Sequence, residues 1–220
     1  TTVLHLTDTA RGGLEHMNSQ TSMMPRACLF PDHPDEYRDL VSLFSHEYLH
    51  QWNVKRLRPK CFLDYDLQSE VHTDLLWWFE GATCWLGDMM CVRSGAWTEK
   101  DWRLDFERKM KRHTAKNGML RESLAESSHD AWIHLYRSGP YTRENQISYY
   151  LEGELALLCL DTEMRRRNGN TFGACDLMAE LVRRYAIHSE EAEHMGVDYN
   201  DIRATLKQCP GGASMGPYLD

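Results

Sequence analysis

The sequence has little of what membrane-spanning or nucleic-acid-binding proteins need. Among its 220 residues, no apolar run approaches the roughly 20 residues of a membrane-spanning helix. Acidic residues outnumber basic ones by 33 to 25, so the chain has no broad basic excess that would suit a phosphate backbone. The one cluster of arginines, at positions 165–167, ends a predicted helix and complements the helix dipole. We therefore expect neither a membrane nor a nucleic acid as a partner.

Paired cysteines are also lacking. The seven cysteines form no CxxC motif and their number is odd, which is typical of buried free thiols rather than of a disulfide framework. This usage favours a reducing compartment, and we expect a cytoplasmic location. The chain starts at Thr1 and shows no signal-peptide pattern, so we interpret it as part of a longer protein.

Repeats and low-complexity tracts are absent, and most of the apolar periodicity is helical. Short alternating runs on either side of a Gly12-Gly13 break predict two or three strands within residues 1–30. A helix is expected to begin at Pro31 or Pro34 and to run past residue 50. Further helices are predicted over about 73–93, 98–116, 147–168, 173–187 and 199–208, with short helices and turns over 121–146. We predict one mainly α (α+β) domain, with a small β-sheet portion over 1–30 and a helical portion over 31–220.

The motif His46-Glu47-Tyr48-Leu49-His50 is the strongest chemical signal. Residues four apart on a helix project from one face, so the two imidazoles can reach one zinc ion. The side chain of Glu47 can reach a water molecule beside that metal, which makes Glu47 the candidate general base. The alternative is a surface helix that happens to carry two histidines.

A third ligand is expected because a catalytic zinc keeps three protein ligands and one open position. Glu80 is the one acid in the apolar run over residues 75–83, and a buried, unpaired carboxylate there would be costly. Coordination of a metal removes that cost, as would an ion pair with an arginine. Glu70 and Asp74 are nearby alternatives that look more exposed.

Two weaker signals accompany the motif. The pair Gly12-Gly13 lets a substrate approach the backbone closely, and the following Glu15 offers a carboxylate to a bound cation, although such a pair is most often only a turn. Tyr149 and Tyr150 begin a predicted helix, where a phenol can donate a hydrogen bond to a developing oxyanion. Two aromatic core residues would give the same pattern.

Taken together, these segments resemble the glycyl aminopeptidase family of gluzincin metallopeptidases. The resemblance is dense over residues 46–59, which read HExxH-x-W-N-x-K-R-x-R-P. Residues 12–16 resemble the family's GGLEH, residues 78–83 its Glu-Gly segment, and residues 126–132 and 148–153 further segments. Two positions differ from the more distant relatives: Phe79 stands where Ser or Asn is frequent, and Glu152 where their Tyr-x-Lys-Gly pattern has lysine.

The resemblance implies a thermolysin-like catalytic domain that binds Zn²⁺ and removes small N-terminal residues, such as Gly or Ala, from a peptide substrate. It implies that His46, His50 and Glu80 hold the metal, that Glu47 is the base, and that Glu15 binds the substrate's α-amine. The register of the Tyr-x-Lys-Gly pattern selects Tyr150 for the oxyanion. The alternatives are a zinc endopeptidase or another zinc hydrolase on the same fold, or a non-catalytic binding domain with a vestigial zinc site.

Overall fold

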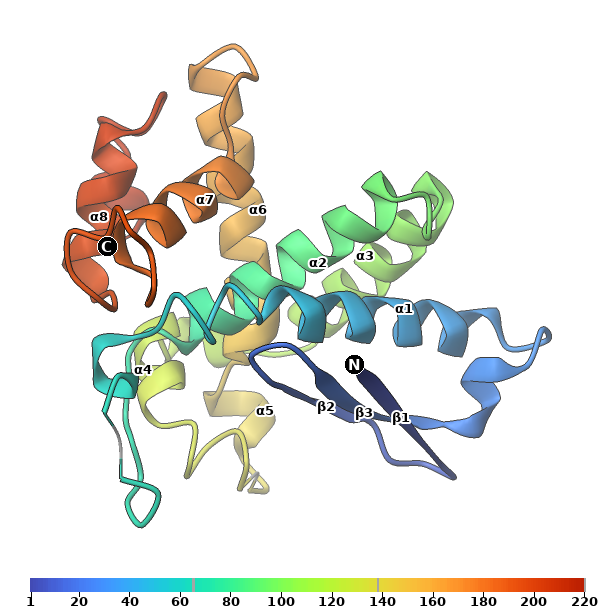
Figure 1. Cartoon of the computed structure of the whole chain (residues 1–220). Helices are drawn as coiled ribbons and strands as arrows, with labels where there is room; N and C mark the ends of the chain where they lie inside the picture. The colour runs from blue at the N-terminus through green and yellow to red at the C-terminus, as the bar shows by residue number, and fades with distance from the viewer. Residues whose placement is uncertain (65, 138, 220) are drawn as a thin grey trace.

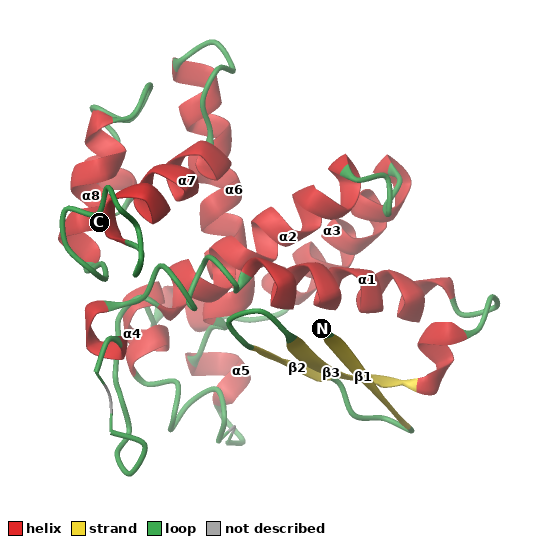
Figure 2. Ribbon diagram, viewed as in Figure 1, coloured by secondary structure: helices red, strands yellow, loops and turns green. Residues whose placement is uncertain are grey.

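A computed structural model describes residues 1–64, 66–137 and 139–219. The chain is mainly helical, with a three-stranded sheet at its N-terminal end (Figure 1), which confirms the expected class. Figure 2 shows the same view with helices in red, strands in yellow and loops in green. In the described part of the chain, no helix combines the length and apolar character that crossing a membrane requires.

The sheet consists of β1 (Thr2–Thr7), β2 (Gly12–Glu15) and β3 (Gln20–Pro25) in the order β1-β3-β2. β1 pairs with β3 in parallel, and β2 pairs with β3 in antiparallel register, with Gly13 opposite Ser22. Gly12-Gly13 was expected to be a break between strands, and that prediction was wrong because both glycines belong to β2. This order leaves β2 at one edge of the described sheet.

The helix with the histidine motif is α1 (Pro34–Leu49). Proline at the first position and acids in the first turn suit the start of a helix, as expected. The helix ends at Leu49, slightly earlier than predicted, yet His50 as its C-cap keeps helical angles of φ −59° and ψ −16°. α1 lies between the sheet and α2 (Figure 1), and Leu40 and Leu43 form a small core with Met24 of β3.

The helix predicted over about 73–93 consists of two parts. A π-helical segment, η3 (Trp77–Ala82), continues directly into α2 (Thr83–Arg93). Glu80 lies in the π-helical part, where the wider turn changes the direction of its side chain relative to a regular helix. The periodicity of an apolar run does not distinguish this from a continuous α-helix.

The remaining helices lie close to their predicted ranges. α3 (Glu99–Thr114) begins at the expected capping box of Thr98 and Asp101. The long α6 (Tyr149–Arg167) packs against η3, α2 and α3. The others are α4 (Leu124–His129), α5 (Thr142–Asn145), α7 (Ala174–Tyr185) and α8 (Tyr199–Gln208), with short 3₁₀ turns η1 (Arg26–Leu29), η2 (Lys60–Phe62), η4 (Gly118–Leu120) and η5 (Gly216–Tyr218).

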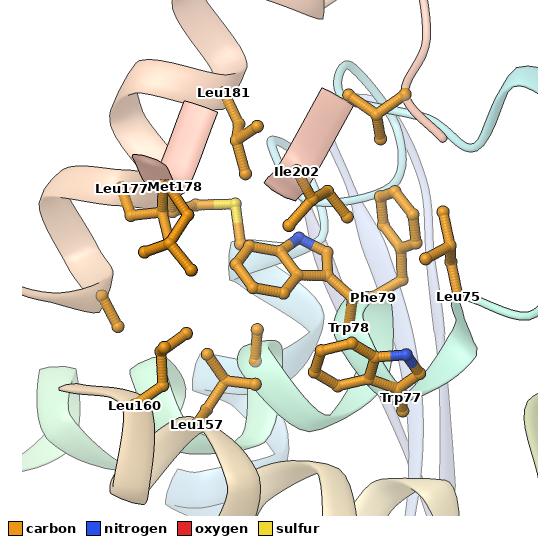
Figure 3. Packing of buried hydrophobic residues seen from close by; sticks show 14 of the residues in the cluster. Leu75, Trp77, Trp78, Phe79, Leu157, Leu160, Leu177, Met178, Leu181 and Ile202 are labelled. Carbon is orange, nitrogen blue, oxygen red and sulfur yellow. The ribbon is translucent and has the colours of Figure 1, made fainter. Parts of the chain in front are cut away.

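The main core fixes η3 in place. Trp78 and Phe79 have no exposed surface, and Figure 3 shows the indole of Trp78 among side chains of α7 and α8, including Leu177, Leu181 and Ile202. Burying an aromatic side chain of this size contributes on the order of 3 kcal/mol. Because Glu80 follows these two anchors in the chain, the core holds the backbone of Glu80 at a defined place.

Candidate metal centre

Three side chains with metal-binding atoms converge where α1 meets η3. The Nε2 atoms of His46 and His50 lie 2.9 Å apart, and Glu80 Oε2 lies 3.1 Å from the first and 3.3 Å from the second. The spacing of four residues in the last turn of α1 places both rings on one face. The core that anchors η3 brings Glu80 to the same point. The structure thus assembles the three residues predicted as ligands.

Burial and mutual charge shift the pKa values of these three groups in the metal-free site. Burial opposes a charge on His50, but the neighbouring Glu80 outweighs burial and raises the pKa of His50 to about 9. Burial, with His50 nearby, lowers the pKa of His46. Burial works against ionisation of Glu80 as well, yet His50 and His46 hold its pKa below the usual range. In the metal-free site, a protonated His50 therefore faces an ionised Glu80.

The donor set fits zinc. Two imidazole nitrogens and one carboxylate oxygen form one of the common ligand sets of catalytic zinc. Ligands held tetrahedrally at about 2.0–2.1 Å from zinc lie roughly 3.3 Å from one another. The observed separations of 2.9–3.3 Å are close to that value. The residues present can therefore hold such an ion with little movement.

Asn53 orients the second histidine. His50 Nδ1 lies 2.7 Å from the Asn53 carbonyl oxygen, which fixes Nε2 as the atom that faces Glu80. The side-chain amide of Asn53 donates to the Phe79 carbonyl at 3.2 Å and to Thr83 Oγ1 at 3.0 Å. Asn53 thereby ties the loop after α1 to the helix that carries Glu80. Asn53 belongs to the run at residues 46–59 that resembles the family, but the sequence alone does not indicate this role.

Cys84 orients the first histidine. His46 Nδ1 lies 3.5 Å from Cys84 Sγ, and no other described residue forms a hydrogen bond with this nitrogen. Burial and the neighbouring Glu154 raise the pKa of the Cys84 thiol well above its usual value, so the thiol stays uncharged. Cys84 follows Glu80 by one helical turn, a spacing that could have indicated a contact with the same site.

Glu47 lies beside these residues, and one oxygen of its carboxylate is unsatisfied. The residue is 4% exposed, and its Oε2 has no hydrogen-bond partner among the described residues. Burial, opposed by His50 and assisted by Glu15, raises the pKa of Glu47 to about 7. Gly13 makes room for this side chain, because a Cβ on Gly13 would lie 2.0 Å from Glu47 Oε1. A buried carboxylate of this kind is suited to accept a proton near neutral pH.

Glu15, at the end of β2, is close to the same group but is already paired. Its carboxylate lies within 4.8 Å of the ligand-type atoms of Glu47 and His50. Lys55 Nζ contacts Glu15 Oε1 at 3.0 Å. The sequence analysis did not predict this ion pair. A carboxylate has several acceptor positions, so Lys55 does not occupy all of them.

The structure distinguishes the two tyrosines. Tyr149 is 1% exposed and belongs to the main core. Tyr150 lines a cavity of about 710 Å³ together with Gly12, Gly13 and Glu47. Its ring centroid lies 6.2 Å from that of His46. Of the two candidates, Tyr150 is therefore the one beside His46 and the cavity.

The other candidates lie elsewhere. Glu70 lies 3.6 Å from His72, and Asp74 lies 3.0 Å from His129. Neither acid therefore belongs to the group formed by His46, His50 and Glu80. Glu152 contacts His113 Nδ1 of α3 at 2.7 Å, so the charge of Glu152 is directed to α3. This placement explains how a glutamate is accommodated near Tyr150, where the more distant relatives have lysine.

Comparisons with known proteins agree with these features. A family model described as M61 glycyl aminopeptidase matches residues 39–156, the part that contains the three ligand-type residues. Among solved structures, the chain is similar to an aminopeptidase N family protein from Idiomarina loihiensis, with a TM-score of 0.91 and 31% identity. The match covers 99% of this chain and 37% of that protein's chain, so the present chain spans just over a third of that length. No curated protein matches the sequence.

Proposed function

The chain belongs to the M61 glycyl aminopeptidase family, and on that basis we propose that it catalyses zinc-dependent removal of small N-terminal residues from peptides. One observation carries the proposal. His46, His50 and Glu80 converge within 3.3 Å beside the buried, unpartnered carboxylate oxygen of Glu47. A structural zinc site would be closed, usually with four protein ligands.

His46, His50 and Glu80 would hold the ion. When bound, zinc supplies a Lewis acid that polarises the scissile carbonyl and lowers the pKa of water. Cys84 and Asn53 orient the two imidazoles through their Nδ1 atoms, which leaves both Nε2 atoms for the metal.

Glu47 moves the proton in this scheme. Its carboxylate accepts a proton from the attacking water and then delivers it to the nitrogen of the leaving amine. In the metal-free site burial raises the pKa of Glu47 to about 7, which makes this carboxylate a stronger base than an exposed glutamate. Gly13 keeps the Glu47 side chain between β2 and the ligand atoms.

Tyr150 donates a hydrogen bond to the oxyanion. Burial, together with the neighbouring Glu80, keeps the pKa of Tyr150 well above its usual value, so the hydroxyl carries its proton at neutral pH. Loss of one such donor typically costs on the order of 3 kcal/mol in the transition state.

Glu15 and the two glycines bind the substrate. Glu15 holds the free α-ammonium beside Lys55, so that the bond after the first residue meets Glu47. Gly12 and Gly13 line the cavity on the edge strand β2, whose backbone groups are available to an extended peptide.

The test combines zinc content with turnover of Gly- and Ala-arylamides. The unmodified chain is expected to bind one zinc ion and to release the arylamine. Glu47→Gln keeps the size of the side chain and the three ligands, so we expect unchanged zinc content with turnover reduced by at least about 10³-fold. Full activity of this variant would contradict the assigned role of Glu47.

The ion pair between Glu15 and Lys55 favours an endopeptidase as a second candidate, since it already neutralises the proposed amine anchor. Free and N-acetylated forms of one peptide distinguish the two. An aminopeptidase cleaves only the free form, and Glu15→Gln reduces that cleavage. Equal cleavage of both forms, unaffected by Glu15→Gln, identifies an endopeptidase.

A further inference from the structure

Arg11, which directly precedes β2, lines the cavity beside Glu47. Its guanidinium is held by Asp39 of α1: Nε donates to Asp39 Oδ2 at 2.8 Å, and Nη2 donates to Asp39 Oδ1 at 2.9 Å. Two parallel hydrogen bonds of this kind fix the plane of a guanidinium as well as its position. Arg11 therefore has a defined orientation at the cavity wall, although its side chain is 50% exposed.

The third nitrogen of the guanidinium is available to a ligand. Asp39 binds Nε and Nη2, and Nη1 has no hydrogen-bond partner among the residues that the structure describes. The negative charge of Asp39 would repel a second carboxylate at Nη1, but it would not repel an uncharged acceptor. Nη1 therefore suits a carbonyl oxygen better than an anionic group.

The charge of Arg11 acts on two residues of the proposed active site. Burial raises the pKa of Glu47 to about 7, and Arg11 is among the neighbouring charges that limit this rise. Burial lowers the pKa of His46, and Arg11 contributes to that lowering. The guanidinium therefore lies close enough to both residues for direct charge interaction, on the wall of the cavity that all three share.

The order of residues along β2 indicates which part of a peptide meets Arg11. Glu15, the proposed anchor of the α-amine, ends the strand, and Arg11 directly precedes it. Gly13 lies between them, at the point where a Cβ would lie 2.0 Å from Glu47 Oε1. Glu15 and Arg11 are each two residues from Gly13, so they lie on opposite sides of it, up to about 7 Å away along the chain.

A peptide with its α-amine at Glu15 and its scissile bond at Glu47 therefore continues toward Arg11 with the residue that follows that bond. This step rests on the proposed function. We propose that Arg11 is a substrate-binding residue whose Nη1 donates a hydrogen bond to the carbonyl oxygen of this following residue. Asp39 is the positioning residue that orients the guanidinium. The substrate class that follows is peptides with a main-chain carbonyl beyond the cleaved bond, which are favoured over simple amides of one amino acid.

The test compares glycyl-alaninamide with glycine isopropylamide, in which a methyl group replaces the carboxamide beyond the cleaved bond. Because Arg11 is half-exposed, we expect Arg11→Gln to lower kcat/KM about tenfold for glycyl-alaninamide and less than about twofold for glycine isopropylamide. Asp39→Asn should give a smaller loss that is confined to glycyl-alaninamide. Arg26→Gln is the matched control, because Arg26 also pairs with an aspartate, Asp8, and is not among the described residues that line the cavity.

Binding to the zinc-loaded Glu47→Gln variant separates this inference from the proposed function. In that variant glycyl-alaninamide should bind about tenfold more tightly than glycine isopropylamide, and adding Arg11→Gln should remove the difference. Equal losses of kcat/KM for both amides, or a binding preference that is absent or survives Arg11→Gln, overturn the inference alone if the unmodified chain hydrolyses the amides. A preference that requires Arg11 in a protein that hydrolyses neither amide supports the contact and overturns the proposed function.

Discussion

Gly81 and Gly153 bring the backbones of η3 and α6 into direct contact: a Cβ on Gly81 would lie 2.5 Å from the carbonyl carbon of Gly153. Glu80 directly precedes the first glycine, and Tyr150 lies about one helical turn before the second. The contact therefore fixes the proposed metal ligand and the proposed oxyanion donor relative to each other. η3 and α6 are about 70 residues apart in the sequence, yet they pack closely because both residues at the contact are glycines.

Replacement of either glycine should be strongly destabilising. In Gly81→Ala the added methyl group meets backbone atoms, which cannot rotate away, so α6 must move from η3. Overpacking of this kind typically costs about 1–3 kcal/mol, which denaturant unfolding will measure. Gly87→Ala in α2 is the control, because its Cβ would lie 3.4 Å from the nearest atom. Equal stability of the two variants would show that the contact can relax.

Substitutions at Gly13 and Gly12 test the position of the proposed general base, Glu47, without changing the Glu47 side chain itself. The Cβ of Gly13→Ala would overlap Glu47 Oε1 at 2.0 Å, whereas that of Gly12→Ala would meet only Met23 Cε at 3.8 Å. We expect Gly13→Ala to displace Glu47 and to lower kcat about 10²-fold, as misplacement by about 1 Å can. Gly12→Ala keeps the backbone groups proposed to meet the substrate and leaves Glu47 in place, so its kcat should fall far less than that of Gly13→Ala.

Zinc content, measured beside kcat, shows where the effect acts. The atoms nearest to a Cβ at these positions belong to Met23 and Glu47 and not to a proposed ligand, so both variants should bind zinc like the unmodified chain. If Gly13→Ala loses its zinc, or keeps full turnover, the proposed relation between Gly13 and Glu47 is wrong.

Local geometry made the three ligand-type residues predictable. Two histidines four residues apart share a helix face wherever the helix forms, so their convergence needs no knowledge of the fold. Glu80 stands out because a carboxylate in an apolar run requires a specific partner. The mainly helical class followed in the same way from apolar periodicity and from the Thr98 capping box.

Contacts between distant segments were not predictable. The Glu15–Lys55 pair joins a strand to the loop after α1, and the contact of Glu152 with His113 joins α6 to α3. Periodicity also does not reveal the π-helical turn at Glu80, because it differs from an α-helix by one residue per turn. These features depend on how elements pack, which a single sequence does not encode locally.

Cys84 should tune the affinity of the metal site. Its thiol is the hydrogen-bond partner of His46 Nδ1 at 3.5 Å, so Cys84→Val removes that partner while roughly conserving volume. Loss of such an orienting contact typically weakens metal binding about 10- to 100-fold. Competition with a chromogenic chelator will measure this affinity without reference to activity.

Two further variants make the Cys84 experiment specific. Cys84→Ser restores a group that can bond to His46 Nδ1, and zinc affinity should recover toward that of the unmodified chain. Cys91→Val removes a buried thiol of the same helix that contacts the Val41 carbonyl instead of a ligand, and affinity should not change. Equal loss in both valine variants would indicate general destabilisation of α2.

Zinc binding should release about one proton near pH 8, where Glu47 with its pKa of about 7 is already mostly ionised. In the metal-free site the pKa of His50 is raised to about 9, so His50 is protonated at pH 7, whereas the lowered pKa values of His46 and Glu80 leave those groups without a proton to release. Since the proton of His50 competes with zinc, apparent affinity should rise about tenfold per pH unit from pH 7 to pH 9 and then level off.

Calorimetric titrations with zinc in buffers of different ionisation enthalpy will count the released protons. The expected count near pH 8 is one, and it should approach zero well above pH 9, where His50 is already neutral. Because its pKa is raised, His50 keeps its proton up to a higher pH than an ordinary histidine. That proton therefore opposes zinc binding over a wider range of pH. Affinity that stays constant between pH 7 and pH 9 would mean that His50 is already a neutral ring in the metal-free site, and that Glu80 does not raise its pKa.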